Sequence, residues 1–307
     1  ILILVFFYIY FLIDHLITDK ILSIDSLLDF IDDRESFIGA FPQKEQTQDK
    51  NQKILDEIEK NNLDRSVISI LNTKDKINIV TSMKGGVGKT YFCIKIFKKL
   101  SSLDKKVCIV DFDLRKKGLS FTKESNLPSE HFITFNDFEK SNEDFDSCII
   151  KGPVTEDPIR FLSSQKINEF TDKLRKKFDF VLIDTPPLGT FVDAKLLTES
   201  VDSAVIILSS HLSTFGEIKT LKKELNASSN KNLEMKYFLN RVRYFLEIFK
   251  FKFKYPYYGY YNYYNYYDSY SYLNNEDNTV TFRSILSFII ESTTELKDKL
   301  LKLFRKK

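Results

Sequence analysis

The sequence predicts an α/β fold in which a mostly parallel sheet is flanked by helices, and two observations carry that prediction. First, short apolar runs recur between residues 77 and 239, and stretches with helical spacing lie between them. Runs that are apolar throughout are typical of strands buried on both faces, as in parallel sheets. Second, a glycine-rich turn follows the first run and leads into a helix, which indicates a strand–turn–helix unit.

The elements can be placed in chain order. Apolar residues at helical spacing predict one helix before the first strand and others between strands. Helices are expected at residues 53–71, 89–103 and 167–177. Strands are expected at residues 77–81, 107–110, 180–183, 204–208 and 235–239. Residues 120–158 have no clear pattern, so no element is predicted there.

Composition divides the chain into five parts. The first thirteen residues carry no charge. As a helix at about 1.5 Å per residue they would span roughly 20 Å, short of the ~30 Å hydrocarbon core of a membrane. We interpret them as the end of a transmembrane helix that begins upstream, with a buried core helix or strand pair as the alternative. The expected parts are the transmembrane end (1–13), a juxtamembrane segment and linker (14–52), the α/β domain (53–250), a tyrosine cluster in a flexible tail (251–275) and a C-terminal amphipathic helix (276–307).

Charge and cysteine content narrow the function classes. The chain has 46 basic and 43 acidic residues, a net charge of +3, so charge gives no reason to expect a nucleic-acid partner. Cys93, Cys108 and Cys148 have no metal-ligand spacing. We interpret them as reduced core thiols in a protein of a reducing compartment.

The strongest motif is a phosphate-binding loop (P-loop) between the first strand and the helix after it. It reads Lys84-Gly85-Gly86-Val87-Gly88-Lys89-Thr90. Glycines let backbone N–H groups close around phosphates, and the helix N-terminus adds a partial positive charge. Lys89 is expected to reach the β- and γ-phosphates, and Thr90 to place its hydroxyl on Mg²⁺. The motif therefore predicts ATP and Mg²⁺ as cofactors and a P-loop NTPase fold.

Acidic residues follow two of the expected strands and are predicted to lie beside this loop. Asp111 and Asp113 come after the second strand, and Asp184 comes after the third. The carboxyl ends of parallel strands line the ligand crevice of such folds. One carboxylate there can hold Mg²⁺ and another can take a proton from a nucleophile. A simple role as helix caps is the alternative.

Tyrosine is concentrated near the end of the chain. Eleven of the sixteen tyrosines are Tyr255, Tyr257, Tyr258, Tyr260, Tyr261, Tyr263, Tyr264, Tyr266, Tyr267, Tyr270 and Tyr272. Polar residues and glycine separate them, and no aliphatic residue interrupts the run. Such a segment cannot bury an ordinary core, so we expect a flexible tail.

Together these motifs resemble the bacterial tyrosine kinases (BY-kinases), the cytoplasmic parts of polysaccharide co-polymerases that control capsule or exopolysaccharide export. The resemblance covers roughly residues 1–272. Besides the P-loop and the tyrosine cluster, it rests on Gly39-Ala40-Phe41-Pro42, Asp111-Phe112-Asp113-Leu114-Arg115, Ile183-Asp184-Thr185-Pro186-Pro187, Asp193-Ala194 and Leu239-Asn240-Arg241.

The resemblance implies an ATP-dependent tyrosine autokinase that phosphorylates its own cluster on a neighbouring subunit. The catalytic set would be Lys89, Asp111, Asp113 and Asp184, and the metal ligands would be Thr90, Asp111 and Asp184. Asp113 is the better candidate for activating a phenol. Asn240 and Arg241 lie where related ATPases contact the adenine.

The resemblance also implies partners and a location. The partners would be neighbouring copies of the chain, the polysaccharide polymerisation and export machinery, a protein-tyrosine phosphatase and the membrane. The location would be the inner (cytoplasmic) membrane, with the kinase domain in the cytoplasm. In that family a helix before the first strand carries a Glu and two Arg that build a ring. Here Asn62, Arg65 and Ile68 stand at those positions, so one of three is kept and a dimer is the alternative.

Two other functions fit parts of the sequence. Met83 replaces the first glycine of the usual loop, and Lys84 is typical of the ParA/MinD ATPases, where it reaches into the partner subunit. A dimerising ATPase switch without a protein substrate is therefore the main alternative. A non-catalytic module with an adhesive, self-associating tyrosine patch is the third, and the complete set of nucleotide-binding residues disfavours it.

Overall fold

The computed structural model describes residues 19–21, 23–43, 49–114, 127–141, 144–228 and 233–242, with side chains from residue 55 onward in the helix that begins at 49. The chain forms two units, Ile1–Lys252 and Phe253–Lys307, and all described residues belong to the first. Of the expected parts, the transmembrane end, the tyrosine cluster and the C-terminal helix lie outside the described residues.

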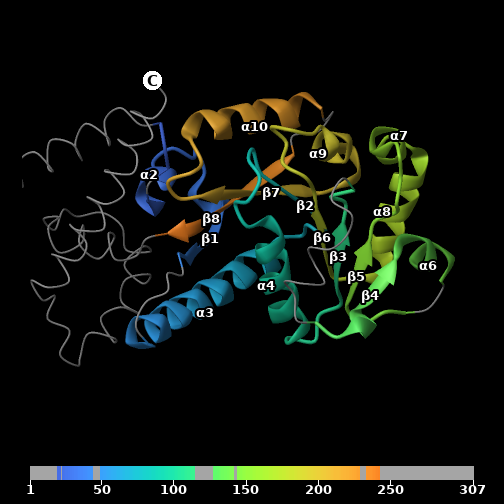
Figure 1. Cartoon of the computed structure of the whole chain (residues 1–307), viewed down its shortest axis with the longest axis horizontal. Coiled ribbons are helices and arrows are strands. Elements are labelled where there is room, and N and C mark those ends of the chain that lie inside the picture. The colour runs from blue at the N-terminus through green and yellow to red at the C-terminus, as the bar shows by residue number, and fades with distance from the viewer. Residues whose placement is uncertain are drawn as a thin grey trace, which may run out of the picture. The chain divides into compact units, whose positions relative to one another are not determined.

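The first unit is built on an eight-stranded sheet in the order β1-β8-β7-β2-β6-β3-β5-β4, shown in Figure 1. Every pair of neighbouring strands in it is parallel. The strands are β1 (Phe37–Pro42), β2 (Ile77–Thr81), β3 (Val107–Asp111), β4 (Phe132–Thr134), β5 (Cys148–Lys151), β6 (Phe180–Asp184), β7 (Ser203–Ser209) and β8 (Glu234–Val242). Strands β2, β3, β6 and β7 are buried along their whole length, as continuous apolar runs in a parallel sheet should be.

Helices cover both faces of this sheet, with α3 and α4 on one side and α10 on the other (Figure 1). The helices are α2 (Ile24–Leu28), α3 (Asp49–Leu71), α4 (Lys89–Ser101), α6 (Phe135–Lys140), α7 (Pro158–Leu162), α8 (Gln165–Lys177), α9 (Asp193–Leu196) and α10 (Phe215–Ala227). Short 3₁₀ turns lie at Arg34–Ser36, Ser129–His131 and Thr198–Ser200. None of the helices in the described part of the chain has both the length and the apolar character needed to cross a membrane.

The α/β fold with helices on both faces of a parallel sheet is confirmed, and the five expected strands are β2, β3, β6, β7 and β8. Three strands were not expected. Strand β1 comes from the segment interpreted as a juxtamembrane linker, and it pairs with β8 at one edge of the sheet. Gly39 lies in this strand because a Cβ there would overlap Ser66 Oγ on α3. A strand with a glycine inside and a proline at its end belongs at an edge.

All three cysteines are buried free thiols, which confirms their interpretation as core residues. Cys108 and Cys148 face each other from neighbouring strands β3 and β5, with their sulfur atoms 4.0 Å apart. That separation is about twice the length of a disulfide bond.

Candidate functional site

The candidate site lies at the carboxyl ends of three adjacent strands, β2, β6 and β3. The P-loop leaves the end of β2, while Asp184 ends β6 and Asp111 ends β3. In the parallel register Asp184 pairs with Val80 on one side and with Asp111 on the other. The register therefore places both carboxylates at the same end of the sheet as the P-loop, while their roles in metal binding and catalysis stay predictions.

Glycines give the P-loop its shape. Gly86 and Gly88 have φ angles of 73° and 102°, in the left-handed region where a side chain is strained. A Cβ at Gly88 would also overlap Asn240 Nδ2. Gly88 is the N-cap of α4, so the first turn of that helix starts inside the loop. A helix N-terminus reached by a glycine-rich turn is a preformed site for an anion such as phosphate.

Two residues at the end of β8 form hydrogen bonds with the P-loop. Asn240 Nδ2 donates to the carbonyl of Val87 at 2.8 Å, and an Arg241 Nη donates to the carbonyl of Gly86 at 2.7 Å. Arg241 itself has a φ of 58°, an uncommon conformation for a residue other than glycine. These contacts bring both residues to the P-loop; their contact with an adenine remains a prediction.

The two P-loop side chains expected to carry chemistry are both placed by hydrogen bonds. Lys89 is largely buried, and its Nζ donates to Ser82 Oγ at 3.1 Å. Ser82 Oγ in turn donates to the carbonyl of Lys84 at 2.7 Å. Thr90 Oγ1 donates to Asp184 Oδ2 at 2.7 Å. No motif in the sequence points to Ser82, and only the folded loop shows that it positions Lys89.

The carboxylates repel each other. Burial, and then the nearby carboxylate of Asp184, raise the pKa of Asp111 to about 7. Asp113 lies two residues after Asp111, and its backbone N–H donates to Asp111 Oδ1 at 3.2 Å. A divalent cation between two such carboxylates would remove the repulsion.

The residues present fit Mg²⁺. Thr90 offers a hydroxyl, and Asp111 and Asp184 offer carboxylates, all of them the hard oxygen ligands that Mg²⁺ takes in proteins. Mg²⁺ at nucleotide sites is held by one or two carboxylates with substrate phosphates and water, so this set is sufficient.

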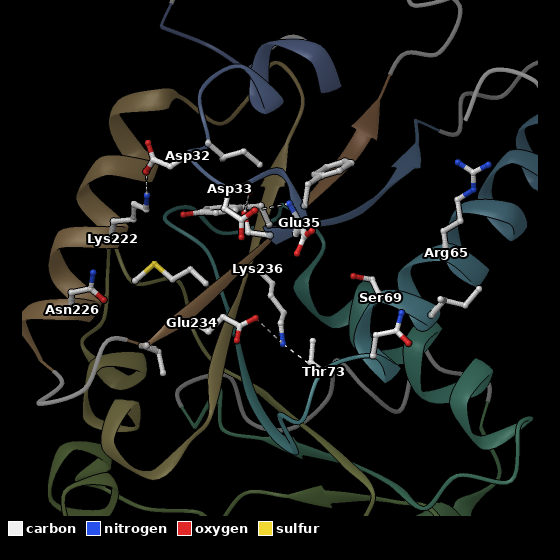
Figure 2. Close-up of a pocket in the computed structure, with 18 residues that line it drawn as sticks. Asp32, Asp33, Glu35, Arg65, Ser69, Thr73, Lys222, Asn226, Glu234 and Lys236 are labelled. Carbon is white, nitrogen blue, oxygen red and sulfur yellow. Dashed lines mark hydrogen bonds and ion pairs between the residues drawn. The ribbon is translucent and has the colours of Figure 1, made fainter. Parts of the chain in front are cut away.

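A separate cavity of about 860 Å³ lies at the amino ends of the strands, beside the start of β8 (Figure 2). Lys222 and Asn226 of α10 line one side of it, and Arg65 and Ser69 of α3 line the other. Because the P-loop and both carboxylates lie at the opposite ends of the strands, this cavity is not the nucleotide site.

The three positions aligned with the ring-forming residues differ in exposure. Asn62 is buried, Arg65 is half-buried, and Ile68 is 58% exposed. Of the three, only Ile68 is exposed, and its side chain is apolar.

Comparisons with known proteins identify a nucleotide-binding family. The family model described as "CobQ/CobB/MinD/ParA nucleotide binding domain" matches residues 78–243, more than half of the chain. The tyrosine-protein kinase CpsD of Streptococcus pneumoniae serotype 4 is 27% identical over 166 residues, 52% of this chain and 73% of CpsD. The putative tyrosine-protein kinase CapB of Staphylococcus aureus is 26% identical over 55% of this chain and 78% of its own length.

Solved structures support the fold. The BceF tyrosine kinase domain aligns with a TM-score of 0.53 at 21% identity, covering 73% of this chain and 99% of that domain. The kinase domain of the Escherichia coli tyrosine kinase ETK aligns with a TM-score of 0.52 at 18% identity, covering 73% and 94%. The chain belongs to the CobQ/CobB/MinD/ParA nucleotide-binding domain family, and within it to the bacterial tyrosine kinases, at moderate identity to the relatives compared.

Proposed function

We propose that this chain is an ATP-dependent protein-tyrosine kinase that phosphorylates the tyrosine cluster of a neighbouring copy. The observation that carries the proposal is that the P-loop, with Lys89 and Thr90, lies at the same end of the sheet as Asp184 and Asp111, and that Thr90 bonds to Asp184. The same chain carries eleven tyrosines between residues 255 and 272, a ready supply of phosphoacceptors.

The residues divide the work between binding and proton transfer. Thr90, Asp111 and Asp184 would hold Mg²⁺, which when bound would neutralise charge on the β- and γ-phosphates. Lys89 and the backbone N–H groups of the P-loop would bind and orient the triphosphate. Most of the rate must then come from positioning the acceptor in line with the γ-phosphate.

The acceptor phenol needs help to react at neutral pH, because its pKa is about 10. Asp113 is the proposed base, since it lies beside Asp111 and is half-buried rather than fully enclosed. In the transfer, the phenol oxygen forms a bond to the γ-phosphorus, and the bond from that phosphorus to the ADP oxygen breaks. The phenolic proton goes to the Asp113 carboxylate and then to solvent.

The proposal extends to the cellular setting. We propose that the kinase regulates the chain length and export of a capsule or exopolysaccharide, that it assembles with copies of itself, and that a protein-tyrosine phosphatase reverses its action. The proposed location is the inner membrane, with residues 1–13 as the anchor and the kinase domain in the cytoplasm. The resemblance to BY-kinases and the uncharged start of the chain support these assignments.

The test is incubation of the full chain with Mg-ATP, followed by mass spectrometry of phosphorylated sites. Phosphate should appear on residues 255–272, and Lys89→Met should abolish it. Replacing all eleven tyrosines by phenylalanine should remove the acceptors and leave nucleotide binding unchanged. If ATP is hydrolysed while every tyrosine of the cluster stays unmodified, the kinase proposal is wrong.

The alternative is a dimerising ATPase of the ParA/MinD type without a protein substrate. Lys84 favours it. It predicts inorganic phosphate as the only product, together with ATP-dependent dimerisation that Lys84→Ala disrupts. Analytical ultracentrifugation with and without Mg-ATP separates the two functions.

A further inference from the structure

Lys84, the first residue of the P-loop, is held by the loop that joins β7 to α10. Its Nζ lies 2.5 Å from Glu217 Oε1 and donates to the carbonyl of Leu212 at 3.0 Å. The Glu217 side chain is only 13% exposed, while that of Lys84 is 52% exposed. The cation of the P-loop is therefore tied within its own subunit to the first turn of α10.

Glu217 also caps the N-terminus of α10. Its Oε2 accepts from the N–H of Thr214 at 3.3 Å, while Thr214 Oγ1 accepts from the N–H of Glu217 at 3.2 Å. This reciprocal pair is a capping box, which fixes the start of α10. The position of the Glu217 carboxylate, and through it of Lys84, thus depends on how residues 210–217 are held.

Residues 19–21, in the N-terminal part of the chain, form hydrogen bonds with this loop and with the first turn of α10. The carbonyl of Asp19 accepts from the N–H of Phe215 at 2.9 Å, and Asp19 Oδ2 accepts from the N–H of Gly216 at 2.9 Å. Both N–H groups belong to the first turn of α10, where the helix itself offers no acceptor. A Cβ at Gly216 would lie 2.9 Å from Asp19 Oδ2, so the glycine allows the carboxylate to approach.

Backbone contacts extend the attachment along the segment. Ile21 donates to the carbonyl of Ser213 at 2.9 Å and accepts from the N–H of His211 at 2.8 Å. His211 has a φ of 65°, a strained conformation for a residue other than glycine that its surroundings must maintain. Residues 19–21 therefore fix the loop that carries the two acceptors of Lys84.

We propose that Glu217 is a positioning residue that holds Lys84 away from the bound triphosphate, and that Asp19 strengthens this hold by capping α10. The inference rests on the proposed nucleotide site. Lys84 must leave the Glu217 carboxylate to place its ammonium on a polyphosphate, so part of the nucleotide's binding free energy is used to break the pair. A protein in which Lys84 is released should bind nucleotide more tightly, because a larger fraction is competent to bind.

The first arm of the test measures nucleotide affinity in the full chain, using a fluorescent N-methylanthraniloyl derivative of ATP with Mg²⁺. Glu217→Gln removes the charge but keeps an acceptor for the capping box. We expect its dissociation constant to fall about two- to five-fold, the range expected for loss of a partly exposed ion pair. The same substitution in a Lys84→Ala background should have no effect, because no ammonium remains to be released.

The second arm tests, without nucleotide, how firmly Glu217 holds Lys84. It measures by mass spectrometry the rate at which an acylating reagent modifies Lys84. Glu217→Gln should raise that rate, and Asp19→Ala should raise it by a smaller factor. Gly216→Ala, which displaces the Asp19 carboxylate and leaves the helix intact, should act as Asp19→Ala does. Glu224→Gln is the matched control, because Glu224 lies on the same helix and pairs with Lys195 instead; it should change neither readout.

The outcomes separate the two proposals. If the wild-type chain does not bind the Mg-ATP derivative, the proposed function is wrong, and so is the expected effect of Glu217→Gln on affinity. The acylation rate of Lys84 would still test whether Glu217 and Asp19 hold Lys84 in place. If the wild-type chain binds nucleotide and Lys89→Ala does not, the site is supported. Equal affinities of wild-type and Glu217→Gln, or an equal change in the Lys84→Ala background, would then overturn the positioning role alone.

Discussion

Asp111 and Asp184 are direct neighbours in the parallel register of β3 and β6, and each is the last residue of its strand. Both are almost fully buried. Burial, and then the repulsion between the two carboxylates, make ionisation of Asp111 costly and raise its pKa to about 7. Without a cation the site is therefore a source of instability that depends on pH.

The first prediction is that the nucleotide-free protein loses stability as pH rises. The pKa of Asp111 is raised in the folded protein to about 7 from an ordinary 3.8, so the folded state holds a proton that the unfolded state has released. Between these two pH values the contribution of Asp111 to stability falls, at about 1.4 kcal/mol per pH unit at most. Urea unfolding at pH 5 and pH 8 measures the loss.

Asp111→Asn tests the cause of this pH dependence. The amide is neutral at both pH values and similar in size, so the variant should be more stable than the wild type at pH 8 and should lose less stability between pH 5 and pH 8. Mg²⁺ with an ATP analogue should stabilise the wild type at pH 8 more than the variant. A wild-type stability that is the same at pH 5 and pH 8 would contradict this reading of the pair.

The second prediction separates two reasons for glycine in the P-loop. At Gly88 a Cβ meets both a φ of 102° and the amide of Asn240, whereas at Gly86 it meets only a φ of 73°, with no atom within 4 Å. Gly86→Ala should cost about 1 kcal/mol from backbone strain alone. Gly88→Ala should cost more, roughly 1–3 kcal/mol. Chemical denaturation gives both values, and equal costs would mean that the Asn240 contact is unimportant.

Much of the site could be predicted because its signals are local. Strands β3 and β6 are each an apolar run that ends directly in an acidic residue, Asp111 or Asp184. The parallel register then brings Asp111 and Asp184 together without further information. The same rule placed the P-loop beside them.

The remainder depends on contacts between residues far apart in sequence. The ion pair of Lys84 with Glu217 joins residues that strands β3 to β7 separate along the chain, and no spacing rule connects the two. Strand β1 contains a glycine and ends on a proline, two residues that disfavour a strand prediction. Strands β4 and β5 have only three and four residues, too few for a periodic signal. Phenylalanine rings such as Phe112, Phe135 and Phe170 pack together around that region instead.

The third prediction concerns a buried cation at the end of the sheet opposite the P-loop. Lys236 is 3% exposed, and its Nζ lies 2.5 Å from Asp75 Oδ2 and 3.3 Å from Thr73 Oγ1. Asp75→Ala leaves this ammonium without its nearest carboxylate and should cost about 3–5 kcal/mol. Lys236→Met should cost less, because it removes the charge together with the need to pair it. In urea unfolding, the double variant should be more stable than Asp75→Ala alone; additive losses would contradict the pairing.

The last prediction assigns the proton transfer. If Asp113 accepts the phenolic proton, Asp113→Asn should lower the rate of tyrosine phosphorylation by about 10²–10⁴-fold, the usual contribution of a general base. Binding of Mg-ATP should change little, because the backbone N–H that contacts Asp111 is kept. Asp184→Asn should instead weaken nucleotide binding, since Asp184 bonds to Thr90 in the proposed metal site.

Asp172→Asn, on the exposed side of α8, is the matched control for loss of a carboxylate. Rates of phosphotyrosine formation and affinities for Mg-ATP, measured on the same preparations, distinguish these roles. A variant at Asp113 that binds Mg-ATP and phosphorylates at the wild-type rate would show that the phenol loses its proton elsewhere.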